Sequence, residues 1–361
     1  MIDRASVTPN PPNVTKGRPG TARWCALGRH DGISLPEMMM TILITMVMMT
    51  AAFGALDDGL TMRENADVSS EMHHNVRMGM NEMSRDLILA GQAIPIGGIP
   101  VPNGAGAAPI NRPGPVPLTF PAGTQVLRPV ITGDALGPLQ LGLATDLVTI
   151  IYADATLDLG QTVLASIAAD GSAMTVAAGT DITLPANELQ VGDLIMFSNA
   201  MGTALQMVTA VSGAQTVTFG SLDPLDLNQR NAAAGTIMQL QDEPGTFPPT
   251  TATRVWMITY FVDASVPGSP RLMRVVNDHQ PTPIAMEIEN LQLTYDLVDG
   301  ATDPAGIDEP VSPNTAADIR KVNIAIGARS HKKHIQTAEY QRTMQTGQVS
   351  LRNLSFFDRY Q

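Results

Sequence analysis

A single carboxylate stands at the edge of a long uncharged run near the N-terminus. Glu37 directly precedes residues 38–56 (MMMTILITMVMMTAAFGAL), nineteen positions without a charged side chain. A carboxylate at the edge of an apolar membrane-length segment is costly unless a cation pairs with it, so such a residue is a functional candidate by default. The plainer alternative is a glutamate that simply ends the segment among lipid headgroups.

A second group of carboxylates lies in the loop formed by residues 299–309 (DGATDPAGIDE). Calcium takes six to eight oxygen ligands from carboxylates and carbonyls on a flexible loop. Asp299, Asp303 and Asp308 are therefore candidate calcium ligands, although their spacing does not match the EF-hand loop. The alternative is a plain solvated turn, and no other metal or cofactor is predicted.

The histidines offer little further chemistry. His331 and His334 flank two lysines, which repel a cation, and a solvated surface is the simpler interpretation. His73 and His74 fall mostly on the polar side of a predicted helix. The sequence has no Gly-x-Ser-x-Gly elbow, Walker loop, His-Glu-x-x-His pair or dinucleotide fingerprint, so the chain is not expected to be an enzyme.

Composition limits the classes of partner. The 361 residues carry a formal net charge of −12, which argues against a direct nucleic-acid partner that needs a basic face. Hydrophobic residues make up 44%, enough for a sizeable core. The single cysteine, Cys25, excludes an intrachain disulfide.

The element that must position Glu37 is a membrane-length helix over residues 33–56. At about 1.5 Å per residue, nineteen residues span roughly 28 Å, close to the hydrocarbon thickness of about 30 Å. Residues 1–32 carry five basic and two acidic side chains, and Asp57 and Asp58 follow the run. The positive-inside rule then places the N-terminus in the cytoplasm and the bulk of the chain outside. A buried core helix and an ordinary signal peptide, cleaved near residues 51–55, are the alternatives.

The remainder of the chain predicts an α+β fold. Over residues 57–91 the helix continues as an amphipathic segment whose apolar stripe is Val68, Met72, Val76, Met80, Met83 and Leu87, with Gly91 as a stop signal. Residues 92–145 are a Gly/Pro-rich loop region. Residues 146–361 form a β-rich head of short apolar runs separated by turns, which favours a mainly antiparallel sheet, or two packed sheets, under the N-terminal helix.

The segment around Glu37 resembles the prepilin signal of type IV pilins and pseudopilins. That pattern is a glycine, a hydrophobic residue, Ser or Thr, Leu, one variable residue and Glu before an apolar helix, and residues 32–37 (GISLPE) fit it in order. The methionine-rich composition after Glu37 departs from the Leu, Ile and Val usual in the family. Pro36 occupies the variable position, which the first turn of a helix tolerates.

The resemblance implies a set of roles for these residues. A prepilin peptidase would cleave after Gly32 on the cytoplasmic face, and Ile33 would become an N-methylated N-terminus. Glu37 would be the fifth mature residue and would pair with the N-terminal amine of a neighbouring subunit during filament assembly. Cys25 would leave with the leader, and the net charge would fall to −15.

Further fragments resemble PilW-type minor pilins in particular. They are residues 83–91, 145–148, 191–194, 260–263, 271–274, 288–292, 322–324 and 349–353. The implied function is a minor pilin of the priming or tip complex of a type IV pilus. Its partners would be other major and minor pilins, the prepilin peptidase, the inner-membrane assembly platform and membrane lipid.

The implied location is the bacterial inner membrane, with a single pass, and afterwards a pilus in the periplasm and outside the cell. Two alternatives stay open. One is a minor pseudopilin of a type II secretion system. The other is a membrane-anchored adhesin that binds its target through residues 92–145 or the acidic head.

Overall fold

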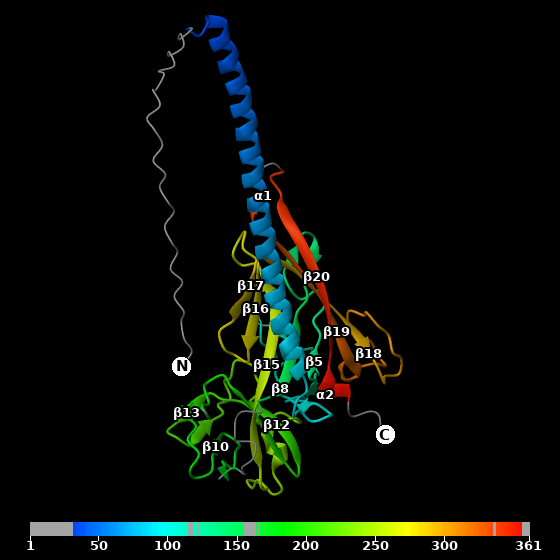
Figure 1. Ribbon diagram of the computed structural model, residues 1–361. Helices are drawn as coiled ribbons and strands as arrows, with labels where there is room; N and C mark the ends of the chain where they lie inside the picture. The colour runs from blue at the N-terminus through cyan, green and yellow to red at the C-terminus, as the bar shows by residue number, and fades with distance from the viewer. Residues whose placement is uncertain are drawn as a thin grey trace, which may run out of the picture. The chain divides into compact units, whose positions relative to one another are not determined.

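The computed structural model describes residues 32–114, 118–121, 123–154, 164, 166–185, 187–334 and 337–355. The predicted leader, apart from Gly32, and with it Cys25, lies outside the described residues. The chain divides into two units, Met1–Met62 and Arg63–Gln361, and each is described by itself. One helix, α1 (Leu35–Leu89), contributes to both units, and strands dominate the rest (Figure 1). The predicted α+β class is confirmed.

In the second unit, α1 buries the predicted apolar stripe. Val76, Met83 and Leu87 have no exposed surface, and Met72 and Met80 are almost as deeply buried. The helix passes close to the strands at Gly347, where a Cβ would lie 2.9 Å from Sδ of Met80. Glycine at this position therefore lets the helix and sheet meet.

The helix ends two residues before the predicted stop. Gly91 follows with a positive φ of 78°, a conformation that glycine adopts without strain. The side-chain amide of Asn353 lies 3.2–3.3 Å from the carbonyl oxygens of Ile88, Leu89 and Ala90 and donates to them. These carbonyls have no partner within the helix, so Asn353 supplies the C-terminal cap.

The main sheet has seven antiparallel strands. Its order is β12 (Gly202–Met207), β11 (Leu194–Asn199), β15 (Thr251–Asp263), β16 (Arg271–Val276) and β17 (Thr282–Met286), while β8 (Val148–Ala153) joins β15 to β5 (Val130–Ile131). The long strand β15 pairs with β11 through its first half, with β16 through its second half, and with β8 on its other side.

A second sheet completes the core. It contains β18 (Ile288–Leu297), β19 (Ile319–Lys333) and β20 (Tyr340–Ser350), paired antiparallel in that order. Side chains from both sheets and from the second half of α1 form one continuous apolar cluster. Figure 1 shows this part of α1 running beside β16 and β20. The helix therefore helps to complete the core of the head.

A smaller sheet carries its own core. Its strands, in spatial order, are β13 (Ala210–Ser212), β14 (Thr216–Thr218), β10 (Ala173–Thr175) and β9 (Ser166–Ile167). Residues 213–215 form the turn between β13 and β14. The apolar cluster packed against this sheet includes Phe197 and Phe219, whose rings meet edge to face with their centroids 5.4 Å apart.

Residues 92–145, predicted as a loop region, contain very short strands. They are β1 (Ile99–Pro100), β2 (Asn111–Arg112), β3 (Leu118–Thr119), β4 (Val126–Leu127), β5, β6 (Leu139–Gln140) and β7 (Leu143–Ala144). Strands of two residues cannot show the alternation that reveals a strand in a sequence. Elsewhere in the described part of the head, η2 (Ile237–Leu240) and η3 (Ala316–Asp318) are short 3-10 helices, and α2 (Arg352–Ser355) is a terminal helix.

A buried arginine fixes part of this region to the main sheet. Arg112 donates from Nε to Oγ1 of Thr149 at 2.7 Å, and its two terminal nitrogens donate to the carbonyls of Thr132 and Ile131. Burial lowers the pKa of Arg112 to about 10. The loop region is therefore held by specific polar contacts.

Candidate functional site

The residues of the predicted processing site lie at the start of α1. Gly32, Ile33 and Ser34 precede the helix, and all three are exposed. The amide of Met38 donates to the carbonyl of Ser34 at 3.1 Å, which closes the first helical turn. Pro36 fits this turn because its missing N–H would have no partner within the helix. The bond after Gly32 therefore lies in exposed chain outside the helix.

Glu37 occupies the first turn of the helix and is exposed. A carboxylate is favoured there, since the N-terminal end of a helix carries a partial positive charge. Glu37 has no ion pair or side-chain hydrogen bond to any residue that the structure describes. Its carboxylate is thus available to a cation from outside the chain.

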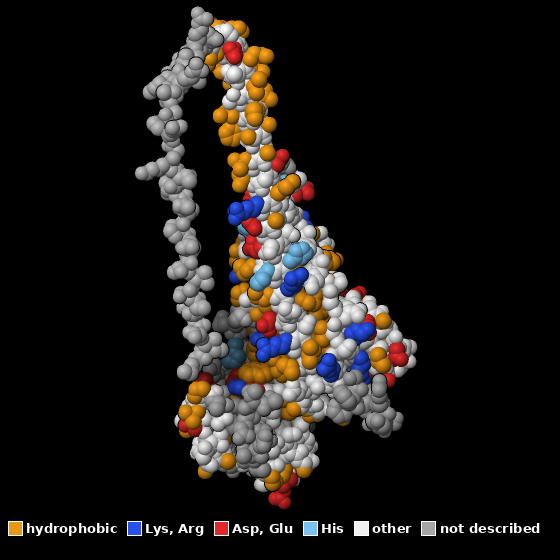
Figure 2. All heavy atoms as spheres, in the orientation of Figure 1, with side chains coloured by type: hydrophobic (Ala, Val, Ile, Leu, Met, Phe, Trp, Pro, Cys, Tyr) orange, Lys and Arg blue, Asp and Glu red, His pale blue; other side chains and the backbone are white. Residues whose placement is uncertain are grey.

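The apolar run behind Glu37 is helical and uncovered. A window of 18 residues within α1 has a mean hydropathy of 2.0, and the described residues bury none of it. Figure 2 shows hydrophobic side chains covering the visible face of this part of the helix. The absence of burial argues against the core-helix alternative, and the segment is compatible with membrane anchoring, though a signal sequence would share these properties.

The threonine hydroxyls inside this run donate hydrogen bonds to backbone carbonyls of the same helix. Thr45 and Thr50 donate to the carbonyls four residues earlier, those of Thr41 and Met46, at 2.7 and 2.8 Å. Thr41 donates to the carbonyl of Met38 at 2.9 Å. Such bonds lower the cost of placing a hydroxyl in hydrocarbon.

A buried carboxylate near the other end of α1 was not predicted as a site. Asp86 is 3% exposed and accepts hydrogen bonds from Tyr260 Oη at 2.6 Å, Arg274 Nε at 2.8 Å and Tyr152 Oη at 3.1 Å. These partners come from β15, β16 and β8. Asp86 therefore links the helix to three strands of the main sheet. The sequence signal that could have revealed this site is the position of Asp86 directly before Leu87 of the apolar stripe.

The three side chains that donate to Asp86 have raised pKa values. Burial and the negative charge of Asp86 raise the pKa of Tyr152 and of Tyr260 above the usual value of 10. Burial by itself would lower the pKa of Arg274, but its hydrogen bond and ion pair with Asp86 raise it overall. Both phenols and the guanidinium thus remain donors to Asp86 at neutral pH.

Replacing Asp86 with alanine is expected to lower the free energy of unfolding of the head by about 3–5 kcal/mol, because it leaves the Arg274 charge and two hydroxyls without their partner. Chemical denaturation of the detergent-purified chain, followed by circular dichroism, measures the change. Asp67→Ala, an exposed position on the same helix, should stay within about 0.5 kcal/mol of the parent. Equal, small effects at both positions would contradict a linking role for Asp86.

The candidate calcium ligands are all exposed. Asp303 accepts from the backbone amide of Gly300 at 3.3 Å and so stabilises its own turn. Within the described ranges, no three His, Cys, Asp or Glu side chains gather in a way that could hold a metal ion. The structure does not bring Asp299, Asp303 and Asp308 together as a ligand set, and calcium binding stays an untested alternative to the solvated turn.

The histidines also lie apart from any such group. His331 faces Glu71 of α1, with Nδ1 3.3 Å from Oε2, and both side chains are exposed. His73 and His74 are exposed, as their predicted place on the polar side of the helix requires.

Comparison with known proteins adds little. No family model and no curated protein matches the chain. One solved structure, a type IV-like pilin from Thermus thermophilus, aligns with 46% of this chain and 87% of its own, at 11% identity and a TM-score of 0.18. A likeness at that TM-score carries no argument. The chain's own layout, a long apolar N-terminal helix followed by an antiparallel β head, fits a pilin.

Proposed function

We propose that the chain is a minor pilin that takes part in assembly of a type IV pilus, as a subunit of the priming or tip complex. The observation that carries this proposal is the continuity of α1. Its first half is an exposed apolar segment that begins directly after the Gly32–Glu37 motif, and its second half belongs to the core of the head. An element of this kind can leave a bilayer for a filament without unfolding the head.

The mechanism follows from the start of the helix. Cleavage after Gly32 creates a positively charged amine at Ile33, four residues before the carboxylate of Glu37. In the membrane or in a filament, the Ile33 amine and the Glu37 carboxylate of each subunit lie in apolar surroundings. An unpaired charge is costly there. Pairing of Glu37 with the Ile33 amine of a neighbour removes that cost and fixes the axial register of the two helices.

The proposal has defined partners and a defined location. The prepilin peptidase removes the leader, membrane lipid holds the helix, and the assembly platform passes the subunit to other major and minor pilins. The head lies outside the cytoplasm, first at the inner membrane and then in the filament. The role is structural, without an enzymatic step.

The N-terminus of the protein purified from membranes tests the proposal. Edman sequencing and intact mass should give a chain that starts at Ile33 when the prepilin peptidase is present and at Met1 when it is deleted. A start near residue 53 or 56 that does not depend on the peptidase would indicate an ordinary signal peptide and overturn the proposal. In a deletion strain, loss of secretion with intact pili would favour the pseudopilin alternative.

A further inference from the structure

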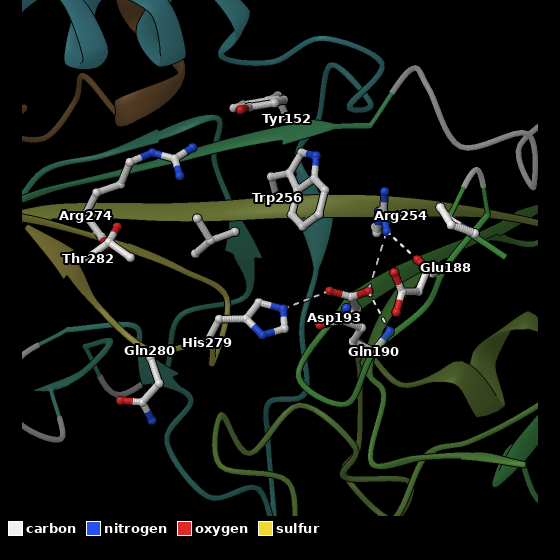
Figure 3. A pocket seen from close by; sticks show the side chains of 12 residues that line it. Tyr152, Glu188, Gln190, Asp193, Arg254, Trp256, Arg274, His279, Gln280 and Thr282 are labelled. Carbon is white, nitrogen blue, oxygen red and sulfur yellow. Dashed lines mark hydrogen bonds and ion pairs between the residues drawn. The ribbon is translucent and has the colours of Figure 1, made fainter. Parts of the chain in front are cut away.

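A cavity of about 550 Å³ opens on one face of the main sheet. On β15, Ile258 and Tyr260 pack in the core with α1, whereas Arg254 and Trp256, further along the same face, line the cavity. Residues of β8, β16, the β16–β17 turn and the segment before β11 complete it (Figure 3). Its volume is within the range of small-molecule sites, about 300–1,000 Å³.

The floor of the cavity is aromatic. Trp256 and Tyr152 are cross-strand partners on β15 and β8, so their side chains project from the same face of the sheet, and both line the cavity. The Arg254 guanidinium lies over the Trp256 ring, 4.5 Å from its centroid, and covers one face. Val276 and Pro185 extend the apolar surface. Such a floor suits a ligand with a flat C–H face.

The charges of the cavity are paired with one another. Nη2 of Arg254 lies 2.5 Å from Oδ2 of Asp154, and Nη1 lies 3.7 Å from Oδ2 of Asp193. Nε2 of His279 lies 2.9 Å from Oδ1 of the same Asp193, and Arg274 is paired with Asp86. Because each cation already has a carboxylate, the cavity offers no free positive charge to an acidic ligand. Glu188 is a lining carboxylate without an ion pair to the described residues, and it is exposed to solvent.

The turn before Asp193 allows its carboxylate to contact both His279 and Arg254. Gly192 has a φ of 98°, and a Cβ there would lie 3.3 Å from Cε1 of His279. Only glycine combines this backbone conformation with so close an approach. The chain thus holds Asp193 between His279 and Arg254, as Figure 3 shows.

Donors and acceptors around the floor remain unused. The carboxylate of Glu188, the side-chain amides of Gln190 and Gln280, and the indole Nε1–H of Trp256 make no hydrogen bond to any residue that the structure describes. The terminal nitrogens of Arg274 are likewise free of bonds within the described part of the chain, since only its Nε contacts Asp86 and Tyr260. A ligand that satisfies this set must both donate and accept.

We propose that this cavity binds a neutral saccharide, with one hexopyranose ring on the Trp256–Tyr152 floor. A pyranose has apolar C–H faces for the aromatic rings, and its hydroxyls both donate and accept, as the free groups around the floor require. The pairing of the cations disfavours an acidic sugar, and a basic sugar would gain little from the solvent-exposed Glu188 carboxylate, so a neutral sugar is favoured. This binding is a further activity of the head and does not depend on the proposed role in filaments.

Trp256 itself supplies the readout. The chain contains two tryptophans, Trp24 and Trp256, so the full-length Trp24→Phe variant reports from the cavity alone. The probes are chitotriose, cellotriose and maltotriose, titrated in a zwitterionic detergent, because glycoside detergents would compete. We expect a saturable change in Trp256 emission with at least one of these neutral trisaccharides.

Matched variants distinguish the cavity from other surfaces. Glu188→Ala and Gln280→Ala each remove one exposed group and should weaken binding about fivefold, the value of one ordinary hydrogen bond. Glu243→Ala, an exposed glutamate away from the cavity lining, should bind like the parent. The inference is overturned if no neutral trisaccharide changes the emission, if only glucuronate- or glucosamine-type probes do, or if the two cavity variants retain full affinity.

Discussion

Gly32→Ala is expected to leave the protein in membranes at its full precursor length, because cleavage by the prepilin peptidase would require glycine before the cut bond. The structure makes this a clean experiment, since a Cβ at Gly32 would meet no atom within 4 Å. The substitution therefore changes recognition by the peptidase without disturbing the fold. Immunoblotting of membranes, with intact mass of the purified protein, measures the ratio of precursor to mature chain.

The matched control is Gly59→Ala. Gly59 lies in α1 and is exposed, and a Cβ at this position would also meet no atom within 4 Å. This variant should be processed like the parent, because it leaves the cleavage motif intact. A mature-size band from Gly32→Ala would refute processing at this site.

Glu37→Gln is expected to be inserted and cleaved normally but to enter filaments at least tenfold less than the parent. The amide keeps the shape of the side chain and removes the charge, so a neighbouring Ile33 amine would be buried without its partner. Breaking a buried pair in this way costs about 3–5 kcal/mol, more than a tenfold change requires. The quantity to measure is the ratio of subunit in sheared filaments to subunit in membranes.

Asp58→Asn provides the charge control. Asp58 is also an exposed carboxylate beside the uncharged run, at its other end, and the same chemical change there should leave incorporation unaltered. Normal incorporation of Glu37→Gln would show that the carboxylate only ends the apolar segment, and equal losses in both variants would point to general damage to the helix.

The sequence predicted the elements with long, regular patterns. The α1 stripe from Val68 to Leu87 has helical spacing over five turns, and the structure buries its core members as expected. The strand runs of the head alternate or stay apolar for five residues or more, which is enough to show their period. The fold class followed from these two signals.

Other features depend on contacts that no local pattern encodes. The partners of Asp86 lie 66 to 188 residues away, so its role as the link between helix and sheet required the fold itself. The cavity around Trp256 combines residues from four separate segments. The short strands of residues 92–145 exist because neighbouring chain supplies their hydrogen bonds, as at Arg112.

The Asn353 cap has a consequence for the timing of folding. Its amide closes the end of α1 from 263 to 265 residues further along the chain. A ribosome adds residues in order, so the helix end keeps open carbonyls until almost the entire chain has been synthesised and, in the proposed topology, exported. The head therefore completes its fold as a late event, after translocation, when the last residues reach the first helix.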